Sequence, residues 1–105
     1  MSILNSAVKI GNRIAPNRIV YQPIECNDGD ELGNPTELTF NRYRKLAEGG
    51  AGIIFIEDLT ITRESRGRIN QLGISEWNAP GLEKLVRAMK GINPYSLIFI
   101  RSVFR

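Results

Sequence analysis

The feature that most constrains the fold is a pair of short, uninterrupted apolar runs at residues 52–56 and 97–100. Each run follows a segment whose apolar side chains repeat at helical spacing. Runs of this length are far too short to span a membrane, and their continuous apolarity is typical of parallel strands buried on both faces. Strands that alternate with helices predict right-handed crossovers and a parallel sheet covered by helices.

The first part of the chain predicts a hairpin followed by a strand. Residues 8–10 and 13–15 flank Gly11 and Asn12, a two-residue turn whose members tolerate positive φ. Residues 18–21 contain β-branched side chains and predict a short strand.

Two amphipathic helices are expected further along. The first begins at either Thr36 or Thr39, each of which can act as an N-cap, and stops at the glycine pair 49–50. The second begins at Asn78 and closes at Gly91. Their predicted buried faces consist of Phe40, Tyr43, Leu46 and Ala47 in the first helix, and Leu82, Leu85, Val86 and Met89 in the second.

The predicted element order is hairpin, β, α, β, α, β within a single domain, residues 1–105. Polar loops are expected at residues 24–36 and 58–75. This order fits either an open doubly wound sheet or the first part of a (β/α)8 barrel. Length favours the open sheet, because a whole barrel takes about 250 residues.

Composition excludes several kinds of site. The chain has no histidine and one cysteine, Cys26, so it offers no internal disulfide, no zinc site and no Ser-His-Asp or Cys-His pair. The net charge of +3 is mildly basic, and its cations at residues 42–45 and 63–68 predict a solvated helix face and a solvated loop. We therefore expect a cytoplasmic protein with no nucleic-acid partner and no membrane segment.

Several stretches follow one another in the order and spacing of a known family. They are residues 8–12, 17–20, 22–25, 33–36 with Tyr43, 46–54 leading into Glu57, 67–68, 73–74 and 81–85. Together they resemble the old yellow enzyme family of NADH:flavin oxidoreductases. This resemblance implies an α/β fold that is a partial (β/α)8 TIM barrel, with an N-terminal hairpin followed by about three parallel strands and two helices. It favours the barrel over the open sheet.

The resemblance also implies an activity and a site. The family transfers electrons from NAD(P)H to FMN and then to an electrophilic small molecule, and its active site lies at the carboxyl ends of the barrel strands. The positions that would contact the flavin are Gln22, Pro23, Ile24, Glu25, Asp58 and Arg101. No catalytic residue and no metal ligand is assigned, because the family takes its substrate-anchoring, proton-donating and phosphate-binding residues from later strands.

Four positions raise separate questions. Glu25 lies two residues after Pro23, at a position where the family that this chain resembles often has a small hydrogen-bond donor. An ionised carboxylate cannot donate a hydrogen bond to a flavin carbonyl. Cys26 is expected to be a small residue packed at a strand end, since a redox role requires a lowered pKa. Asp58 either caps a strand end within a loop or contacts the flavin. Arg101 either replaces a flavin-binding glutamine or belongs to an ending in which truncation or a frame change has replaced the family sequence.

Three functions are compatible with these observations. The first is an FMN oxidoreductase by family, with an isolated chain that is incomplete and needs a missing C-terminal portion or a second chain. The second is a truncated, non-catalytic α/β protein that forms a homo-oligomer without ligand, because an open sheet leaves edges and an apolar face uncovered. The third, a flavodoxin-like module, is disfavoured by the acidic loop at residues 25–31, which would repel a phosphate.

Overall fold

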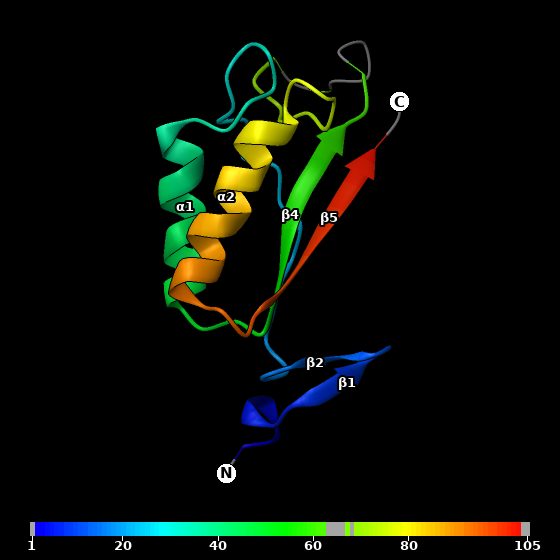
Figure 1. Ribbon diagram of the computed structural model, residues 1–105, viewed down its shortest axis with the longest axis vertical. Helices are drawn as coiled ribbons and strands as arrows, with labels where there is room; N and C mark the ends of the chain where they lie inside the picture. The colour runs from blue at the N-terminus through cyan, green and yellow to red at the C-terminus, as the bar shows by residue number, and fades with distance from the viewer. Residues whose placement is uncertain (1, 63–66, 68, 104–105) are drawn as a thin grey trace.

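The computed structural model describes residues 2–62, 67 and 69–103 (Figure 1). The predicted basic loop, with Arg63, Arg66 and Arg68, therefore lies almost entirely outside the described residues. The elements in chain order are the 3-10 turn η1 (Ile3–Asn5), β1 (Val8–Ile10), β2 (Arg13–Ala15), β3 (Val20–Tyr21), α1 (Glu37–Glu48), β4 (Ile53–Thr60), α2 (Ala79–Ile92) and β5 (Leu97–Val103). This order confirms the predicted one.

The hairpin of β1 and β2 projects from one end of the molecule (Figure 1). Its strands pair antiparallel from Val8 with Ala15 to Ile10 with Arg13, and Gly11 supplies the positive φ, +60°, that the turn requires. Arg18 ties the hairpin region to the body: its N–H donates to the Leu4 carbonyl at 2.8 Å.

The remaining strands form a parallel sheet in the order β3-β4-β5. β3 pairs with β4 over two positions only, whereas β5 follows β4 as far as Thr60. Beyond the end of β3, the segment around Gly73 forms a parallel bridge with Thr60, and Thr60 N–H donates to the Leu72 carbonyl at 3.0 Å. Because β5 pairs with one side of β4, the segment around Gly73 pairs with the other side, beyond the point where β3 ends.

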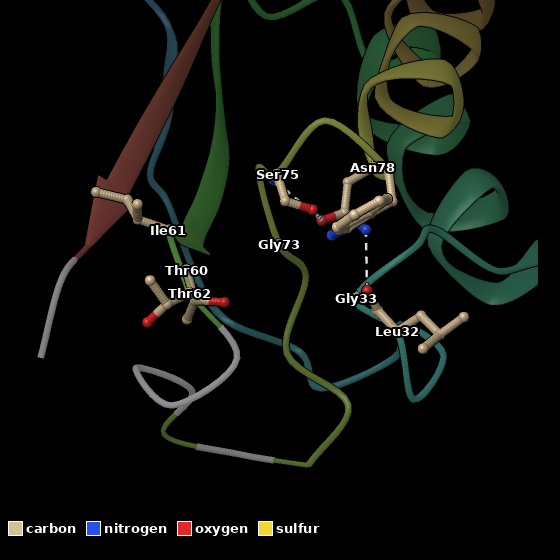
Figure 2. A pocket seen from close by; sticks show the side chains of 9 residues that line it. Leu32, Gly33, Thr60, Ile61, Thr62, Gly73, Ser75 and Asn78 are labelled. Carbon is tan, nitrogen blue, oxygen red and sulfur yellow. Dashed lines mark hydrogen bonds between the residues drawn. The ribbon is translucent and has the colours of Figure 1, made fainter.

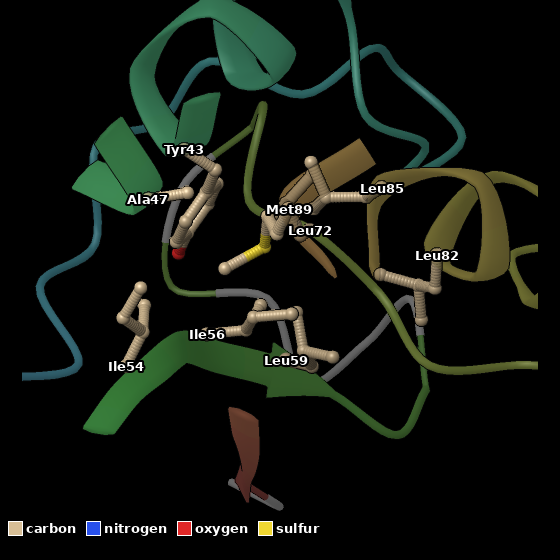
Figure 3. Close-up of a cluster of buried hydrophobic side chains, with 9 residues drawn as sticks. All are labelled: Tyr43, Ala47, Ile54, Ile56, Leu59, Leu72, Leu82, Leu85 and Met89. Carbon is tan, nitrogen blue, oxygen red and sulfur yellow. The ribbon is translucent and has the colours of Figure 1, made fainter. Parts of the chain in front are cut away.

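Both helices pack on one face of the sheet, and the core lies between the two layers (Figures 1 and 3). Its buried members are Tyr43, Ala47, Ile54, Ile56, Leu59, Leu72, Leu82, Leu85 and Met89. The predicted helix faces are thus confirmed, with Phe40, Leu46 and Val86 partly buried against the same cluster. Burying an aliphatic or aromatic side chain contributes about 1.5–3 kcal/mol, so this cluster is the main source of stability.

The opposite face of the sheet is apolar and only partly covered by described residues. Side chains alternate along a strand, so Val20, Phe55 and Phe99 point away from the helices. The Phe55 and Phe99 rings stack with their centroids 5.4 Å apart. Val20 remains 46% exposed. Burial on both faces was therefore a correct prediction for the first half of β4, whereas the shorter β3 is open on this face.

The prediction that β5 is buried on both faces was wrong at Ile100, near the end of this edge strand. Ile100 is 44% exposed, and no described strand pairs with the outer edge of β5. Several boundaries also differ, including the start of β3 at Val20 instead of residue 18 and the end of β5 at Val103 instead of residue 100. β4 continues through residues 58–60, which were expected in a loop, and α2 runs past Gly91 to Ile92. Neither helix is long and apolar enough to cross a membrane in the described part of the chain.

Candidate functional site

The predicted site residues lie where the three parallel strands end. Gln22, Pro23, Ile24 and Glu25 follow β3 directly, while Asp58 and Arg101 lie near the ends of β4 and β5. Parallel strands bring their carboxyl ends to the same edge of a sheet, which Figure 1 shows for β4 and β5. The fold therefore places all six positions at one edge.

Two of these residues are in direct contact. Arg101 Nε lies 2.9 Å from Asp58 Oδ1, with Asp58 mostly buried and Arg101 more than half exposed. The two atoms form an ion pair rather than an aligned hydrogen bond, because Oδ1 has no hydrogen-bond partner of suitable geometry. The interpretation of Asp58 as a loop charge is corrected: it lies within β4.

A bulge in β4 explains why Asp58 meets Arg101. Between Ile56 and Leu59 the strand advances by three residues, whereas β5 advances by two, from Ile100 to Ser102. The extra residue reverses the alternation of side chains. Glu57 and Leu59 consequently turn toward the helices, and Asp58 between them turns to the opposite face.

On the helix side, Glu57 is the centre of a buried charged cluster. Arg42 Nη2 donates to both of its carboxylate oxygens at 3.1 and 3.0 Å, and the Tyr43 hydroxyl donates to Oε2. Arg42 also donates from Nε to Asp28 Oδ2 at 2.9 Å. The prediction that residues 42–45 form a solvated face was wrong for Arg42, because the bulge creates a buried carboxylate that needs a cation.

This cluster changes the ionisation of its members. Burial raises the pKa of Tyr43 well above its usual value, and the negative charge of Glu57 raises it further. Burial opposes the charge of Arg42, yet the hydrogen bonds to Asp28 and the charge of Glu57 outweigh that effect and raise its pKa. Both groups therefore keep their protons at neutral pH and serve to hold structure.

The segment after β3 is more open. Gln22 and Ile24 are exposed, while Pro23 and Glu25 are half-buried. The Ile24 N–H has no partner among the described residues, so this amide is available as a hydrogen-bond donor. The structure places this segment at the same edge of the sheet as the Asp58–Arg101 ion pair.

Cys26 differs from its prediction. It is exposed rather than packed at a strand end. Desolvation of its sulfur nevertheless raises the pKa of the thiol, and the positive charge of Arg42 offsets this only in part. The thiolate fraction at neutral pH is therefore small, which is unfavourable for a nucleophile or redox centre.

The loops behind this edge interlock. Gly29 N–H donates to the Asn70 carbonyl at 2.9 Å, and Asn70 N–H donates to Asn27 Oδ1 at 2.8 Å. Asn27 accommodates this contact with a positive φ of 53°. The described residues contain no cluster of three or more potential metal ligands. The edge thus offers the Ile24 N–H and one ion pair, next to loops that are joined by hydrogen bonds.

Comparisons with curated proteins find two relatives that are more than 30% identical to part of this chain. No family model matches the chain. An NADPH dehydrogenase from Clostridium acetobutylicum is 36% identical over 85 residues, which cover 80% of this chain and 25% of that protein. An NADH oxidase from Thermoanaerobacter brockii is 34% identical over 58 residues, which cover 55% of this chain and 9% of that protein.

Solved structures of old yellow enzyme relatives also superpose on this chain. A 2-naphthoyl-CoA reductase superposes with a TM-score of 0.89 at 27% identity, over 97% of this chain and 16% of that one. The old yellow enzyme homologue from Zymomonas mobilis superposes with a TM-score of 0.83 at 25% identity, over 98% of this chain and 28% of that one. This chain matches the N-terminal portion of the old yellow enzyme family. It spans about a quarter of the length of the NADPH dehydrogenase. The predicted α/β fold class, a part of the family's barrel, is confirmed.

Sequence reasoning located the edge of this old yellow enzyme fold but missed the cluster around Glu57. The signal for that cluster was weak: Arg42 and Glu57 are 15 residues apart, and only the bulge turns Glu57 toward α1. The flavin contacts assigned to Gln22, Pro23, Ile24, Glu25, Asp58 and Arg101 remain predictions.

Proposed function

We propose that this chain forms part of an FMN-dependent NAD(P)H oxidoreductase and provides one edge of its flavin site. The observation that carries the proposal is the Asp58–Arg101 ion pair at the carboxyl edge of a parallel sheet whose relatives are named NADPH dehydrogenase and NADH oxidase. When bound, FMN supplies the hydride chemistry between the nicotinamide and an electrophilic small molecule. A cytoplasmic location is part of the proposal, since nicotinamide nucleotides are the reductant.

The described residues fit the ring edge of such a cofactor. The N–H of Ile24, a residue that is 51% exposed, has no partner among the described residues and would donate to a ring carbonyl, while the ring of Pro23 beside it has a fixed φ. Arg101 places a cation at the same edge, where it would favour negative charge on the ring. Asp58 at 2.9 Å reduces that effect, because it neutralises most of the Arg101 charge.

A chimera tests this proposal. The segment of the Clostridium acetobutylicum NADPH dehydrogenase that aligns with this chain over 85 residues would be replaced by the corresponding residues of this chain. We expect the chimera to purify with bound FMN and to oxidise NADPH. A folded chimera that stays colourless when FMN is added would contradict the proposal.

The same chimera tests the role of the ion pair. Asp58→Asn removes the countercharge from Arg101, so we expect a higher midpoint potential of the bound FMN, measured by spectroelectrochemistry. Glu48→Gln, at the exposed last residue of α1 and therefore toward the amino end of the sheet, is the matched control and should leave the potential unchanged. Equal potentials for both variants would exclude Asp58 and Arg101 from the flavin site.

The isolated chain is expected to be colourless. Ile24 and Arg101 offer ring contacts, but phosphate contacts usually supply much of the affinity for FMN in a barrel, and none is assigned here. Visible absorption of the purified protein, with its intact mass confirmed at 105 residues, measures this. Stoichiometric flavin absorbance would show that these contacts, or a second copy of the chain, suffice.

A second candidate is a non-catalytic protein that self-associates. It is favoured by the apolar face opposite the helices, where Val20 is exposed and the Phe55–Phe99 stack is only half-buried. Pairing two such faces would give a homo-oligomer without any ligand. The chimera separates the two candidates, since only the first predicts flavin binding.

A further inference from the structure

A hollow at the end of β4 is separate from the proposed flavin edge. It has a volume of about 430 Å³, and its lining comes from three segments: the end of β4 with the next two residues, the stretch before α2, and the loop at Leu32 and Gly33 (Figure 2). None of the six predicted flavin contacts lines it. Its volume lies in the range of about 300–1,000 Å³ that small-molecule pockets occupy.

The walls of this pocket are held together by Asn78. Its Nδ2 donates to the Leu32 carbonyl at 2.9 Å and to Asn34 Oδ1 at 2.7 Å, and its Oδ1 accepts from Ser75 Oγ at 2.7 Å. Although Asn78 precedes α2, its side chain makes no capping bond to that helix. It joins two loops that lie more than forty residues apart, so the pocket is preformed and binding needs little reordering.

A pair of glycines brings the same loops into close contact. Gly73 N–H donates to the Gly33 carbonyl at 2.9 Å. A Cβ on Gly33, which has a φ of +85°, would lie 2.9 Å from the Gly73 nitrogen. Only glycine permits this approach, and the contact fixes the floor of the pocket.

The lining indicates the chemistry of a ligand. None of the nine described residues that line the pocket is ionisable. Leu32, Ile61 and Trp77 provide exposed apolar surface beside the hollow, and Trp77 is 72% exposed. Clustered exposed apolar side chains around a cavity are typical of binding sites. Among the described lining residues, an ionic ligand would lose its hydration without gaining a countercharge.

The hydroxyl groups of the lining add a preference. Ser75 donates its proton to Asn78, and Thr60 Oγ1 donates to the Leu72 carbonyl at 3.5 Å. Both oxygens therefore keep lone pairs as acceptors. We propose that this pocket binds a neutral aromatic molecule that carries a hydroxyl group, with its ring against Trp77 and its hydroxyl donating to Ser75 or Thr60.

Umbelliferone, a planar phenol of two fused rings, is a suitable probe at mildly acidic pH, where it is neutral. Trp77 is the only tryptophan of the chain, so energy transfer from its emission to the probe reports binding of the probe to the chain, and calorimetry gives the dissociation constant. We expect saturable binding with one site per chain. The absence of saturable binding up to the solubility limit of the probe would overturn the proposal.

Two ligand analogues test the chemistry. Herniarin, the methyl ether of umbelliferone, lacks the hydroxyl donor and should bind about fivefold more weakly, which corresponds to the loss of one hydrogen bond. The carboxylate derivative of umbelliferone should bind at least about tenfold more weakly, because its charge finds no partner among the described lining residues. Equal affinity for all three compounds would show that the pocket does not select a neutral phenol.

Two leucine variants test whether the probe binds in this pocket. Leu32→Ala removes an exposed side chain, 59% accessible, that lines the pocket, and it should weaken binding about fivefold. Leu38→Ala removes an equally large and exposed side chain, 69% accessible, outside the pocket, and binding should be unchanged. Phe99→Ala, on the far face of the sheet, should also bind as the unmodified chain does. Weakening by Leu38→Ala or Phe99→Ala, but not by Leu32→Ala, would place the probe elsewhere.

Discussion

Asn17 connects the start of β3 to the turn that precedes β4. Its Nδ2 donates to the Gly50 carbonyl at 2.7 Å, while its Oδ1 accepts from Gly52 N–H at 2.7 Å and from Ile19 N–H at 3.0 Å. One side chain thus satisfies three backbone groups at the amino end of the sheet. The hydrogen bond between them requires the Gly52 backbone to lie so close to Asn17 that no side chain fits at position 52.

Gly52→Ala should be strongly destabilising. The added Cβ would lie 2.6 Å from the Asn17 carbonyl oxygen and 2.7 Å from Asn17 Oδ1, so backbone must move. We expect a loss of about 3 kcal/mol in the free energy of unfolding, measured by urea denaturation. Gly91→Ala is the matched control: nothing lies within 4 Å of its added Cβ, and within α2 it should stabilise by about 0.5–1 kcal/mol. Similar losses for the two variants would refute the close approach.

Tyr43 predicts a specific pH dependence. Its hydroxyl donates to Glu57 and accepts from Glu57 N–H at 3.0 Å, so Tyr43→Phe should cost about 1–3 kcal/mol at neutral pH. Because the folded-state pKa of Tyr43 is raised, its contribution is complete below the unfolded pKa of about 10 and is lost as pH rises above that value.

The stability gap between the unmodified chain and Tyr43→Phe should therefore narrow above about pH 10. Urea denaturation of both proteins at neutral and at alkaline pH measures the gap. Tyr95→Phe, at an exposed position, is the control and should show no gap at either pH. A gap for Tyr43→Phe that stays constant into the alkaline range would show that Tyr43 ionises equally in both states.

At the scale of the secondary-structure elements, α2 contributes three of the buried side chains of the core. Leu82, Leu85 and Met89 of that helix are buried against β4, while Lys84 is exposed on its outer side. The apolar stripe recurs every three or four residues, which makes the burial of each position a direct consequence of helical spacing.

Leu85→Asp should be far more disruptive than Lys84→Asp. A carboxylate at the fully buried position 85 has no partner and costs several kcal/mol, whereas a change on the exposed surface usually stays within about 0.5 kcal/mol. Soluble yield and thermal melting of the two variants measure the difference. Equal melting temperatures would refute the packing of α2 on the sheet.

At the scale of the whole molecule, one face of the sheet has too little cover. Each fully exposed aliphatic or aromatic side chain forgoes about 1.5–3 kcal/mol of burial, and a small domain has only about 5–15 kcal/mol of net stability. We therefore expect the isolated chain to associate through the face that carries Val20, most simply as a two-fold dimer.

Light scattering across a dilution series measures this association. Val20→Lys adds a charge at an exposed position of that face and should shift dissociation to higher protein concentration. Leu38→Lys adds the same charge to an exposed position on α1 and should not. A well-folded chain that stays monomeric at high concentration would show that this face needs no second copy.

The sequence by itself determined what depends on local spacing. The apolar runs of β4 and β5, the helical repeat that includes Leu85, and the turn at Gly11 were all predictable, because periodicity and backbone preference act over a few residues. The choice of a barrel segment over an open sheet came from ordered family-like stretches rather than from these physical rules.

The tertiary structure alone decided the roles of the charged and polar residues. The bulge in β4 turned Glu57 toward Arg42 and Asp58 toward Arg101. Asn78 was predicted to begin the second helix. Its side chain also joins the walls of a pocket by hydrogen bonds, because loops far apart in sequence converge on it. A buried charge or amide must find a partner, and which partner it finds depends on the register of strands and the meeting of distant loops, which local spacing does not encode.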